Sequence, residues 1–572
     1  MFDLFSILCY AIKNKQREKN MKVIIACLNS KYVHASLSPW CLLAGVREFS
    51  RNDYDVYVAE STINGDMQAF AQKIINEKPD VVAFSCYIWN ITNTLEICSI
   101  IKKNHCCKIV LGGPEVAYRQ KDVLEKYDFV DFVLSGEGEW TFPDFLDNLN
   151  ADFSLVSGLS YRENGEIVTI PEKEYAETPP SPYSDEFFEN LNGRISYIET
   201  ARGCPYRCAF CLSGRCSPLR FFDINRVKKD IIRLSQSGTQ TLKFIDRTFN
   251  ANAERANEIL LFIKENYGKS IPEGVCFHFE IAGDILKDST LEILSSMPLG
   301  AVQLEIGMQS FNEETLRIIN RRTDTKRLIE NIKKLISFEN MHIHIDLIAG
   351  LTGEDFESFR DSFNIGYSLG AHMLQMGFLK LLHGADMREN DEKYPCTFAD
   401  EPPYEVISTP WISEDEIRML KNCEDALDRL YNSGRFLLTL RYLTDEIGIS
   451  PFDVFNGFGN SVNGNKMRLS DYAESLYNFF SDKCDNEILR EKILCDLLCC
   501  SASVQIPDVL KVRDPLYKQV KKHFTENVDK NIKIAILYSK NQVFAVNQTD
   551  KKDLHNRYEG RIYDISETED LR

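Results

Sequence analysis

The feature that most constrains this chain is a regular alternation of short apolar runs with amphipathic segments, which occurs twice along the sequence. The first series covers residues 21–150, where runs rich in Val and Ile, such as KVIIACLN and KIVLGGP, are separated by helix-like segments such as MQAFAQKIINEK. Strands that alternate with helices in this way form a parallel sheet covered by helices on both faces. We therefore predict an α/β, Rossmann-like domain over residues 21–150.

Several of these apolar runs end in small or polar residues. In open α/β sheets the ligand lies beyond the carboxyl ends of the strands, where such loops gather. Small residues at these ends allow a ligand to approach the backbone closely. The first domain is therefore predicted to bind a ligand through its strand-end residues, which are Ser85, Tyr87, Gly112, Gly113, Glu115, Gly136 and Glu137.

Residues 151–193 interrupt the alternation. They contain a possible hairpin, LSYRENGEIVTI, with Asn164-Gly165 at its turn, followed by the proline-rich segment ETPPSPYSDEFF. An Asn-Gly pair favours a two-residue hairpin turn, and a proline cluster is typical of a linker. We predict the first domain boundary in this region.

The alternation resumes over residues 194–390 with a longer period. The six candidate strands are RISYIETARG, TLKFIDRTF, VCFHFEIAG, AVQLEIGMQS, HIHIDLIAGL and MLQMGFLKLL. Six consecutive β/α units predict a (β/α)6 partial TIM barrel, in which the chemistry takes place at the carboxyl ends of the strands. Polar residues recur at these ends, namely Asp246, Glu280, Glu305, Gln309 and Asp346.

The two ends of the chain carry weaker patterns. Residues 400–572 combine helix-like segments with the late strand-like runs KIAILYS and QVFAVNQ, which predicts a C-terminal α+β accessory domain. At the other end a strand begins directly after Met21, so we interpret residues 1–20 as an N-terminal extension and Met21 as a candidate true start. The apolar run within this extension is too short to cross a bilayer.

The most specific chemical signal is the cysteine spacing in ARGCPYRCAFCLSGR. Cys204, Cys208 and Cys211 follow the first barrel strand as C-x3-C-x2-C, and Phe210 precedes the last of them. Thiolates are the expected ligands of iron–sulfur clusters, and three of them leave one iron of a [4Fe–4S] cluster open to a small molecule. A zinc site completed from elsewhere is the alternative, but zinc knuckles usually pair C-x2-C units. No complementary C-x2-C or H-x3-H occurs downstream.

This motif, at the end of the first strand of a (β/α)6 barrel, resembles that of the radical S-adenosylmethionine (SAM) superfamily, over about residues 194–390. The resemblance implies that the three cysteines bind a [4Fe–4S] cluster and that SAM chelates its open iron through its amino and carboxylate groups. It also implies one-electron cleavage of SAM to methionine and a 5′-deoxyadenosyl radical, with an electron donor such as flavodoxin or ferredoxin. The missing fourth cysteine would thus leave room for SAM.

The same resemblance implies further SAM contacts in the barrel. Phe210 would help to place the adenine, while Asp246 lies where the family's second-strand motif, usually glycine-rich, approaches the amino group. The run EIGMQSFNEETLRIINRRTD resembles a segment of the oxygen-independent coproporphyrinogen oxidases, by which Gln309 and Arg321 would contact SAM, and Asp346 would hold a ribose hydroxyl. Arginine suits a carboxylate, and an acidic side chain can accept from sugar hydroxyls. The candidate SAM contacts are Phe210, Asp246, Glu280, Gln309, Arg321 and Asp346.

The first domain also carries a resemblance. LGGPEV followed by VDFVLSGEGEWTF is similar to the last two strand ends of the cobalamin-binding domains found in many radical SAM enzymes, which makes the strand-end residues candidate cobalamin contacts. The D-x-H-x-x-G pattern that coordinates cobalt from below is missing, and His34 lies on the first loop outside any such pattern. The arrangement resembles class B radical SAM methylases, in many of which cobalt lacks a protein ligand. It implies methylation of an unreactive carbon or phosphorus centre on an unknown substrate, unless the domain has kept its fold and lost the cofactor.

Composition limits the partners. The formal net charge is −18 and the sequence pI about 5.2, whereas a nucleic-acid binder normally has a basic footprint, so we do not expect a nucleic-acid partner. Eighteen cysteines spread over a large chain with no recognisable export signal indicate reduced thiols. No apolar stretch reaches the length of a membrane span. We therefore expect a cytoplasmic enzyme with no membrane partner.

Two other functions stay open. A tRNA methylthiotransferase usually has three further cluster cysteines early in the chain and a basic C-terminal module, whereas here Cys27, Cys41, Cys86 and Cys98 lie in strand- or helix-like segments and the C-terminus is acidic. A non-enzymatic cobalamin or redox sensor would use the cluster without turnover. Cleavage of SAM separates the sensor from the two enzymes, and the methyl acceptor separates the enzymes from each other.

Overall fold

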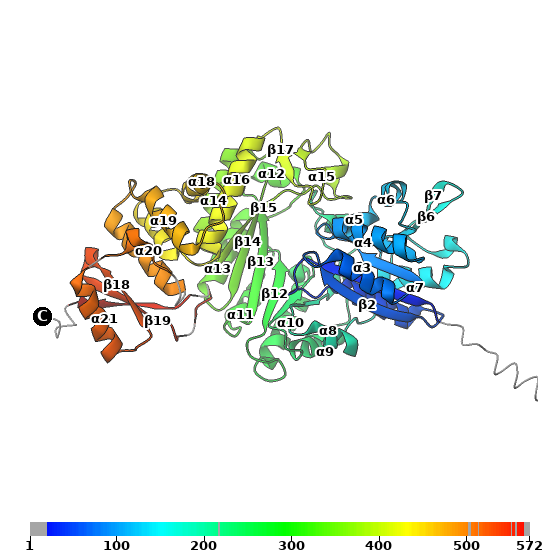
Figure 1. Ribbon diagram of the computed structural model, residues 1–572, viewed down its shortest axis with the longest axis horizontal. Coiled ribbons are helices and arrows are strands. Elements are labelled where there is room, and N and C mark those ends of the chain that lie inside the picture. Colours follow the sequence, from blue (N-terminus) through cyan, green and yellow to red (C-terminus); the bar gives the residue numbers. More distant parts are fainter. Residues whose placement is uncertain are drawn as a thin grey trace, which may run out of the picture.

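The computed structural model describes residues 20–215, 218–500, 505–512, 514–550, 552–554 and 557–565. Figure 1 shows an N-terminal α/β domain, a central sheet of long strands, and a C-terminal part of helices and a small sheet. The predicted N-terminal extension lies outside the described residues except for its last residue. Among the residues described, no helix combines the length and apolar character needed to cross a membrane.

The N-terminal sheet has the strand order β2-β1-β3-β4-β5-β6-β7. Its first five strands are parallel, with β1 paired to both β2 and β3. In sheets of this order the ligand site lies beyond the carboxyl ends of β1 and β3, where the winding direction reverses. The parallel strands are β1 (Lys22–Asn29), β2 (Asp55–Thr62), β3 (Val81–Ser85), β4 (Lys108–Gly112) and β5 (Phe132–Leu134), and the main helices are α2 (Ser38–Phe49), α3 (Met67–Asn76), α4 (Ile91–Asn104) and α7 (Gly138–Asn148).

The predicted hairpin is present as β6 (Leu159–Glu163) and β7 (Glu166–Thr169). Asn164 and Gly165 have φ values of 50° and 86°, and a type I′ turn requires positive φ at both central residues. β6 pairs antiparallel with β5, so the hairpin extends the N-terminal sheet instead of standing apart as a separate unit.

The central sheet is built from the six predicted barrel strands, in the order β8-β11-β12-β13-β14-β15, all parallel. Together with the N-terminal sheet it confirms the predicted fold class. β14 illustrates why the strands could be predicted from the sequence. Exposure alternates along this strand, so every second side chain packs under the helices and the others face the barrel interior. The strands are β8 (Ser196–Ile198), β11 (Thr241–Phe244), β12 (Cys276–Ile281), β13 (Val302–Gln309), β14 (His342–Ala349) and β15 (Met373–Phe378), covered by α9 (Ile224–Ser235), α10 (Ala253–Asn266), α11 (Asp288–Ser295), α13 (Thr325–Ser337) and α14 (Phe356–Ser368).

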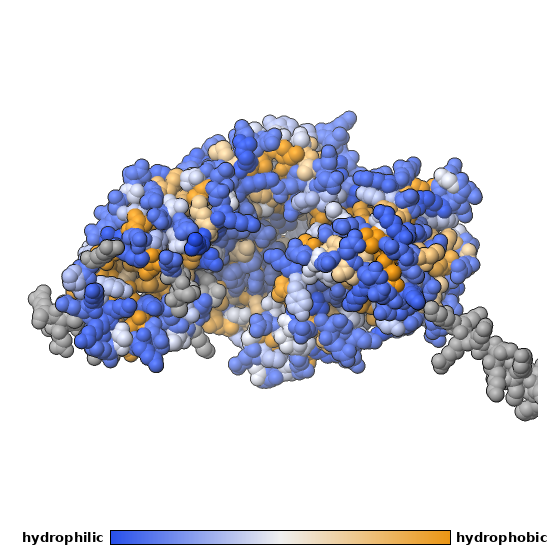
Figure 2. All heavy atoms as spheres, in the orientation of Figure 1, coloured by the Kyte–Doolittle hydropathy of each residue, from blue (hydrophilic) through white to orange (hydrophobic). Residues whose placement is uncertain are grey.

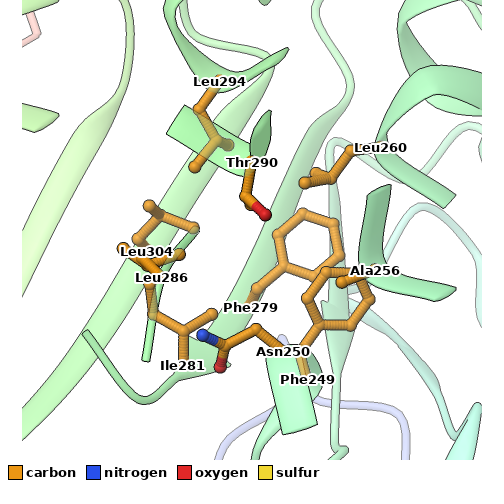
Figure 3. Close-up of a pocket in the computed structure, with 10 residues that line it drawn as sticks. All are labelled: Phe249, Asn250, Ala256, Leu260, Phe279, Ile281, Leu286, Thr290, Leu294 and Leu304. Atoms are coloured by element: carbon orange, nitrogen blue, oxygen red, sulfur yellow. The ribbon is translucent and has the colours of Figure 1, made fainter. Parts of the chain in front are cut away.

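The layer between this sheet and its helices is tightly packed. Figure 3 shows the gap beside β12, where Phe249, Phe279 and Leu294 are among ten lining residues and the free volume is about 10 Å³. The one side-chain amide there, that of Asn250, is satisfied by both the N–H and the carbonyl oxygen of Ala282. A space of this size and apolar lining belongs to the core and has no room for a ligand.

The C-terminal part consists of helices and a three-stranded antiparallel sheet, as the predicted α+β accessory domain requires. It packs against the end of the barrel sheet: the side-chain amide of Asn432 donates to the carbonyl oxygen of Leu374 and accepts from its N–H, both at 2.9 Å. Asn432 thereby pairs the backbone of β15, the last strand of the open barrel. The elements include α16 (Glu414–Leu427), α18 (Pro451–Val462), α19 (Leu469–Phe480), α20 (Asn486–Cys500), β18 (Ile532–Leu537), β19 (Gln542–Asn547) and β20 (Gly560–Asp564).

Candidate functional site

The three motif cysteines lie on a loop that follows β8 and the short strand β9 (Ala201–Arg202). The backbone of this loop is fixed from two sides, because the N–H of Ala209 donates to Ile319 at 2.9 Å and its carbonyl oxygen accepts from Met387 at 3.0 Å. Gly203 has a φ of 95°, a conformation that favours glycine, and this turns the chain into the first cysteine. The fold therefore holds the cysteine loop in a defined position at the carboxyl end of the barrel.

The thiols themselves differ in environment. Cys208 is buried, which raises the pKa of its thiol, while the guanidinium of Arg321, 3.7 Å from its Sγ, acts in the opposite direction. Cys204 and Cys211 are partly exposed, and the Sγ of Cys204 lies 3.5 Å from the hydroxyl of Thr248. In the described part of the chain, no three His, Cys, Asp or Glu side chains are placed to hold a metal ion. A [4Fe–4S] cluster is larger than a single ion and takes each thiolate on a different iron, so more widely spaced thiols suit it.

A cavity of about 170 Å³ opens directly beside the cysteine loop, at the carboxyl ends of β11 to β14. Tyr206 of the loop forms part of its lining, and the ring of Tyr206 lies under the guanidinium of Arg321. Four of the six residues predicted to contact SAM line this cavity, and they are Glu280, Gln309, Arg321 and Asp346. The remaining lining residues are Arg247, Thr248, Ile281, Ala282, Glu305 and Gly307.

Gln309 reaches the cavity through a strained backbone. The register between β13 and β14 shifts between Gly307 and Gln309, and Gln309 has a φ of 71°, which is uncommon for a residue other than glycine. The amide nitrogen of its side chain folds back over Gly307, where an added Cβ would meet it at 2.2 Å. Backbone strain that aims a polar side chain into a cavity is a frequent property of ligand sites.

Two polar atoms near the cavity lack a hydrogen-bond partner. Oδ1 of Asp346 and Nε of Arg321 are both buried and unsatisfied. Burial, together with the neighbouring charges of Glu305 and Glu280, raises the pKa of Asp346 to about 8. Unpaired buried polar groups are rare in native proteins, and an acceptor close to a cationic donor suits a ligand that carries hydroxyl groups and a carboxylate. The chemistry of this pair therefore fits SAM.

A network of charged groups crosses the cavity floor. Nζ of Lys243 lies 3.1 Å from Glu305 and 3.5 Å from Glu280, and Nε2 of His278 lies 2.8 Å from Glu305. Although burial works in the opposite direction, the contacts with His278 and Lys243 lower the pKa of Glu305 to about 2. Lys243 and His278 were not singled out from the sequence. The signal that could have found them is the two-residue period, which puts His278 on the same strand face as Glu280.

Asp246 and Phe210 are placed away from the cavity lining. The carboxylate of Asp246 is buried and accepts from both the N–H and the hydroxyl of Thr200. Burial raises the pKa of Asp246 to about 7, and these hydrogen bonds act against that shift. Asp246 thus anchors the segment that leads into the cysteine loop, and its predicted contact with SAM stays a prediction. Phe210 is half-buried and packs against the core.

Five of the seven candidate cobalamin contacts surround the switch point or the strand ends next to it. Ser85 ends β3, and the ring of Tyr87 stacks on exposed Trp89 with centroids 4.4 Å apart. Gly112 and Gly113 end β4; Gly113 has a φ of 102°, and an added Cβ would meet the carbonyl oxygen of Cys86 at 2.6 Å. This glycine is therefore required by the approach of two loops of the domain itself. Gly136, with a φ of 81°, follows β5.

Glu115 and Glu137, the other two candidates, are engaged by protein groups. Glu115 is buried, pairs with Arg119 at 2.7 Å and accepts from the hydroxyl of Tyr404, a residue that follows the barrel. Burial raises the pKa of Glu115. Glu137 forms ion pairs with Arg202 and Arg220. Glu115 therefore connects the N-terminal domain to the segment after the barrel, and Glu137 connects it to the barrel. Their contact with cobalamin stays a prediction.

A second set of contacts joins the two domains near the first barrel strand. His34 forms a parallel bridge with Ile195, and its Nδ1 lies 2.6 Å from the hydroxyl of Tyr197. Arg202 adds ion pairs with Glu139 at 2.8 Å and Glu199 at 2.6 Å to its contact with Glu137. The loops after β1, β4 and β5 thus all contact the barrel. Figure 2 shows a hollowed surface between the two domains.

Comparison with known families agrees with this arrangement. Residues 198–364, which carry the cysteine loop and the cavity, match the radical SAM superfamily, and residues 22–146 match the B12 binding domain. The chain thus carries a radical SAM domain and a B12-binding domain. Residues 392–567 match a protein family of unknown function, DUF4080. These matches confirm the predicted recognition and, at the level of the two domain families, the predicted cofactors. The exact domain boundaries stay a prediction.

Relatives of this chain include methyltransferases, one of which is a cobalamin-dependent radical SAM enzyme. It is 29% identical over 333 residues to the 2-(S-pantetheinyl)-carbapenam-3-carboxylate methyltransferase of Streptantibioticus cattleyicolor, covering 51% of this chain and 46% of that protein. It is 26% identical to the cobalamin-dependent radical SAM methyltransferase TokK of Streptomyces tokunonensis, covering 61% of this chain and 54% of TokK. The chain thus spans about half the length of these curated relatives.

Among solved structures, the fold is similar to that of the cobalamin-dependent S-adenosylmethionine radical enzyme OxsB with aqua-cobalamin bound. The TM-score is 0.60 at 14% sequence identity, and the match covers 84% of this chain and 80% of OxsB. At this identity the likeness establishes the shared fold.

Proposed function

We propose that this protein is a radical SAM enzyme that uses cobalamin to methylate an unreactive centre of a substrate. The observation that carries the proposal is the pair of unsatisfied buried groups, Oδ1 of Asp346 and Nε of Arg321, in and beside a cavity next to the cysteine loop. The B12-binding domain, whose strand-end loops face the barrel, supports the methylation part of the proposal.

The residues divide into two binding sets. Cys204, Cys208 and Cys211 would hold the [4Fe–4S] cluster, and Glu280, Gln309, Arg321 and Asp346 would hold SAM. When bound, the cluster and SAM supply a 5′-deoxyadenosyl radical, and cobalamin supplies the methyl group. Arg321 contacts both sets, because its guanidinium lies 3.7 Å from the Sγ of Cys208 and also lines the cavity. It would therefore orient the carboxylate of SAM beside the open iron.

Cobalamin would lie between the domains, over the ends of β1 and β3. Ser85, Tyr87 and Gly112 are the contacts that support this placement, and the exposed ring of Trp89 offers an apolar face at the same edge. His34 lies at the contact with the barrel and outside any D-x-H-x-x-G pattern, so it is not proposed as a cobalt ligand. A cytoplasmic location, an electron donor such as flavodoxin or ferredoxin, and a substrate other than nucleic acid complete the proposal.

The tRNA methylthiotransferase alternative gains no support from the early cysteines. Cys27 lies within β1 and Cys98 within α4, both fully buried, and Cys86 is buried directly after β3. Burial raises the pKa of the Cys27 thiol to about 12, which opposes the thiolate form that a cluster needs. These residues act as small apolar side chains in the core of the N-terminal domain.

Anaerobic reconstitution of the full chain with iron and sulfide, followed by addition of SAM and a reductant, tests the proposal. We expect methionine and 5′-deoxyadenosine to form, and a cobalamin titration read by absorbance and EPR to show stoichiometric binding with a base-off spectrum. Cys208→Ala should abolish SAM cleavage and leave cobalamin binding intact. If SAM is cleaved but cobalamin does not bind, the methylation proposal fails and the radical SAM assignment remains.

A further inference from the structure

The interior of the open barrel is lined by polar side chains beyond the SAM cavity. Five residues on four adjacent strands form this surface, which we call the inner wall: Lys243 on β11, His278 on β12, Gln303 and Glu305 on β13, and His344 on β14. They stand in register, because Lys243 lies beside His278, His278 beside Gln303, and Glu305 beside His344. The inner wall is thus a continuous surface across four strands.

A closed TIM barrel fills these positions differently. Its interior layers consist mainly of bulky branched apolar residues that pack the barrel shut. Here the side chains of Lys243 and Glu305 keep 26% and 23% of their surface exposed, so the interior is open to solvent. The opposite face of the same sheet is closed and apolar, as Figure 3 shows around Phe279. The polar character therefore belongs to the inner face alone and is not required for packing.

The inner wall is also organised internally. His278 and Lys243 both contact Glu305, at 2.8 and 3.1 Å, and Nε2 of His344 lies 3.0 Å from the side-chain nitrogen of Gln303. Burial lowers the pKa of His344 to about 4, so at neutral pH this ring carries no charge. The positive charge of Lys243 and the negative charge of Glu305 balance each other. The inner wall thus presents hydrogen-bonding groups held in place by their neighbours, with little net charge.

The N-terminal domain extends this surface. Tyr197 on β8 lies in register with Lys243, and its hydroxyl is held 2.6 Å from Nδ1 of His34, which comes from the loop after β1. The loop at the switch point of the B12-binding domain therefore meets the inner wall directly. A molecule against the inner wall would adjoin the SAM cavity, which Glu305 also lines, and the contact between His34 and Tyr197.

We propose that the inner wall binds the methyl acceptor, and that this acceptor is a water-soluble molecule rich in hydrogen-bonding groups, not a lipid or a tetrapyrrole. This proposal rests on the proposed function. An apolar ring system placed here would exclude water from the inner wall and leave its hydrogen-bond donors and acceptors unpaired. Because unpaired buried polar groups are costly, a site of this kind discriminates strongly against such a ligand. A polar acceptor would instead offer hydrogen-bond partners to these groups.

The test follows the methyl group of SAM. The holoenzyme, with cluster and cobalamin, is incubated with SAM labelled in its methyl group, a reductant, and an extract of the cells that encode the chain. The products are then partitioned between water and chloroform. His344→Leu and Gln303→Leu change the inner wall at positions that neither line the SAM cavity nor belong to the charged network on its floor, and Met419→Leu on the exposed face of α16 is the control.

We expect the label in the aqueous small-molecule fraction, at least tenfold less of it with His344→Leu or Gln303→Leu, and no change with Met419→Leu. Formation of 5′-deoxyadenosine in the absence of extract should be unaltered in all three variants, because the SAM cavity is untouched. Label in the chloroform fraction, or unchanged transfer by both inner-wall variants, would overturn the acceptor class. SAM cleavage without label in either fraction would instead refute methyl transfer itself, and the acceptor proposal with it.

Discussion

We predict that the buried carboxyl group of Asp346 lowers the stability of the ligand-free protein and strengthens the binding of SAM. Its folded-state pKa of about 8 lies above the ordinary value of 3.8, so the folded chain binds this proton more tightly than the unfolded chain. Its contribution to stability is therefore fully present below pH 3.8, decreases as the pH rises, and is lost above pH 8. Four pH units at about 1.36 kcal/mol each give an upper bound of about 6 kcal/mol, and because part of the side chain reaches the open cavity we expect about half, about 3 kcal/mol.

Asp346→Asn keeps the size of the side chain and removes the ionisation. At pH 9 the ligand-free variant should be more stable than the wild type by about 3 kcal/mol, and the two should converge near pH 4. At pH 9, where Asp346 is ionised, the affinity of the variant for SAM should be about 10- to 100-fold lower than that of the wild type, since a hydrogen bond to a charged group contributes about 1.5–3 kcal/mol. Thermal unfolding between pH 4 and 9 and a SAM titration measure the two effects. Equal pH profiles for the two proteins, or unchanged SAM affinity, would refute the reasoning.

Three further substitutions test other parts of the structure. Arg202→Met leaves the carboxylates of Glu137, Glu139 and Glu199 without the cation that they share. The contact between the domains should lose about 3–5 kcal/mol of stability, which limited proteolysis would detect as faster cleavage near residues 193–203. An unchanged rate of proteolysis would contradict this prediction. Gln309→Gly removes a side chain from a residue with positive φ, a backbone conformation that glycine adopts without strain. The free energy of unfolding should therefore change by less than about 1 kcal/mol, while the rate of SAM cleavage should fall at least about tenfold. Full activity of the variant would exclude Gln309 as a SAM contact. Tyr404→Phe removes the hydroxyl that donates to buried Glu115 and should cost about 1–3 kcal/mol, measured by hydrogen exchange at residues 112–119, with Tyr32→Phe on an exposed loop as control.

Local patterns predicted the framework well, because both the strand period and the cysteine spacing act over short stretches of sequence. The exposure of β14 alternates without a break, which is why HIHIDLIAGL was recognised as a strand. Residues at strand ends, such as Glu280 and Asp346, could be assigned to the cavity because all parallel strands end at the same edge. The family matches confirm the type of protein that these patterns indicated.

Contacts between distant segments could not be read in this way. Asp246 has the same position at a strand end as the cavity residues, but Thr200, 46 residues earlier, satisfies its carboxylate. Glu115 accepts a hydrogen bond from Tyr404, 289 residues further along the chain, and the sequence around Glu115 does not indicate this partner. Lys243 was missed for a related reason: its role depends on Glu305, which neighbouring strands bring within 3.1 Å. Which acids bind ligands and which hold domains together is decided by the tertiary structure.

The contact between Asn432 and Leu374 has a consequence for how the chain can be divided. A primary amide has the same donor and acceptor groups as a peptide bond, so Asn432 acts as one residue of a seventh strand along the border of the central sheet. An unprotected border of this kind recruits strands from other molecules. A chain truncated near residue 390 would lack Asn432, so β15 would become an exposed edge strand. We expect such a chain to self-associate through that edge. We therefore expect the segment around Asn432 to protect the edge of the central sheet from pairing between molecules.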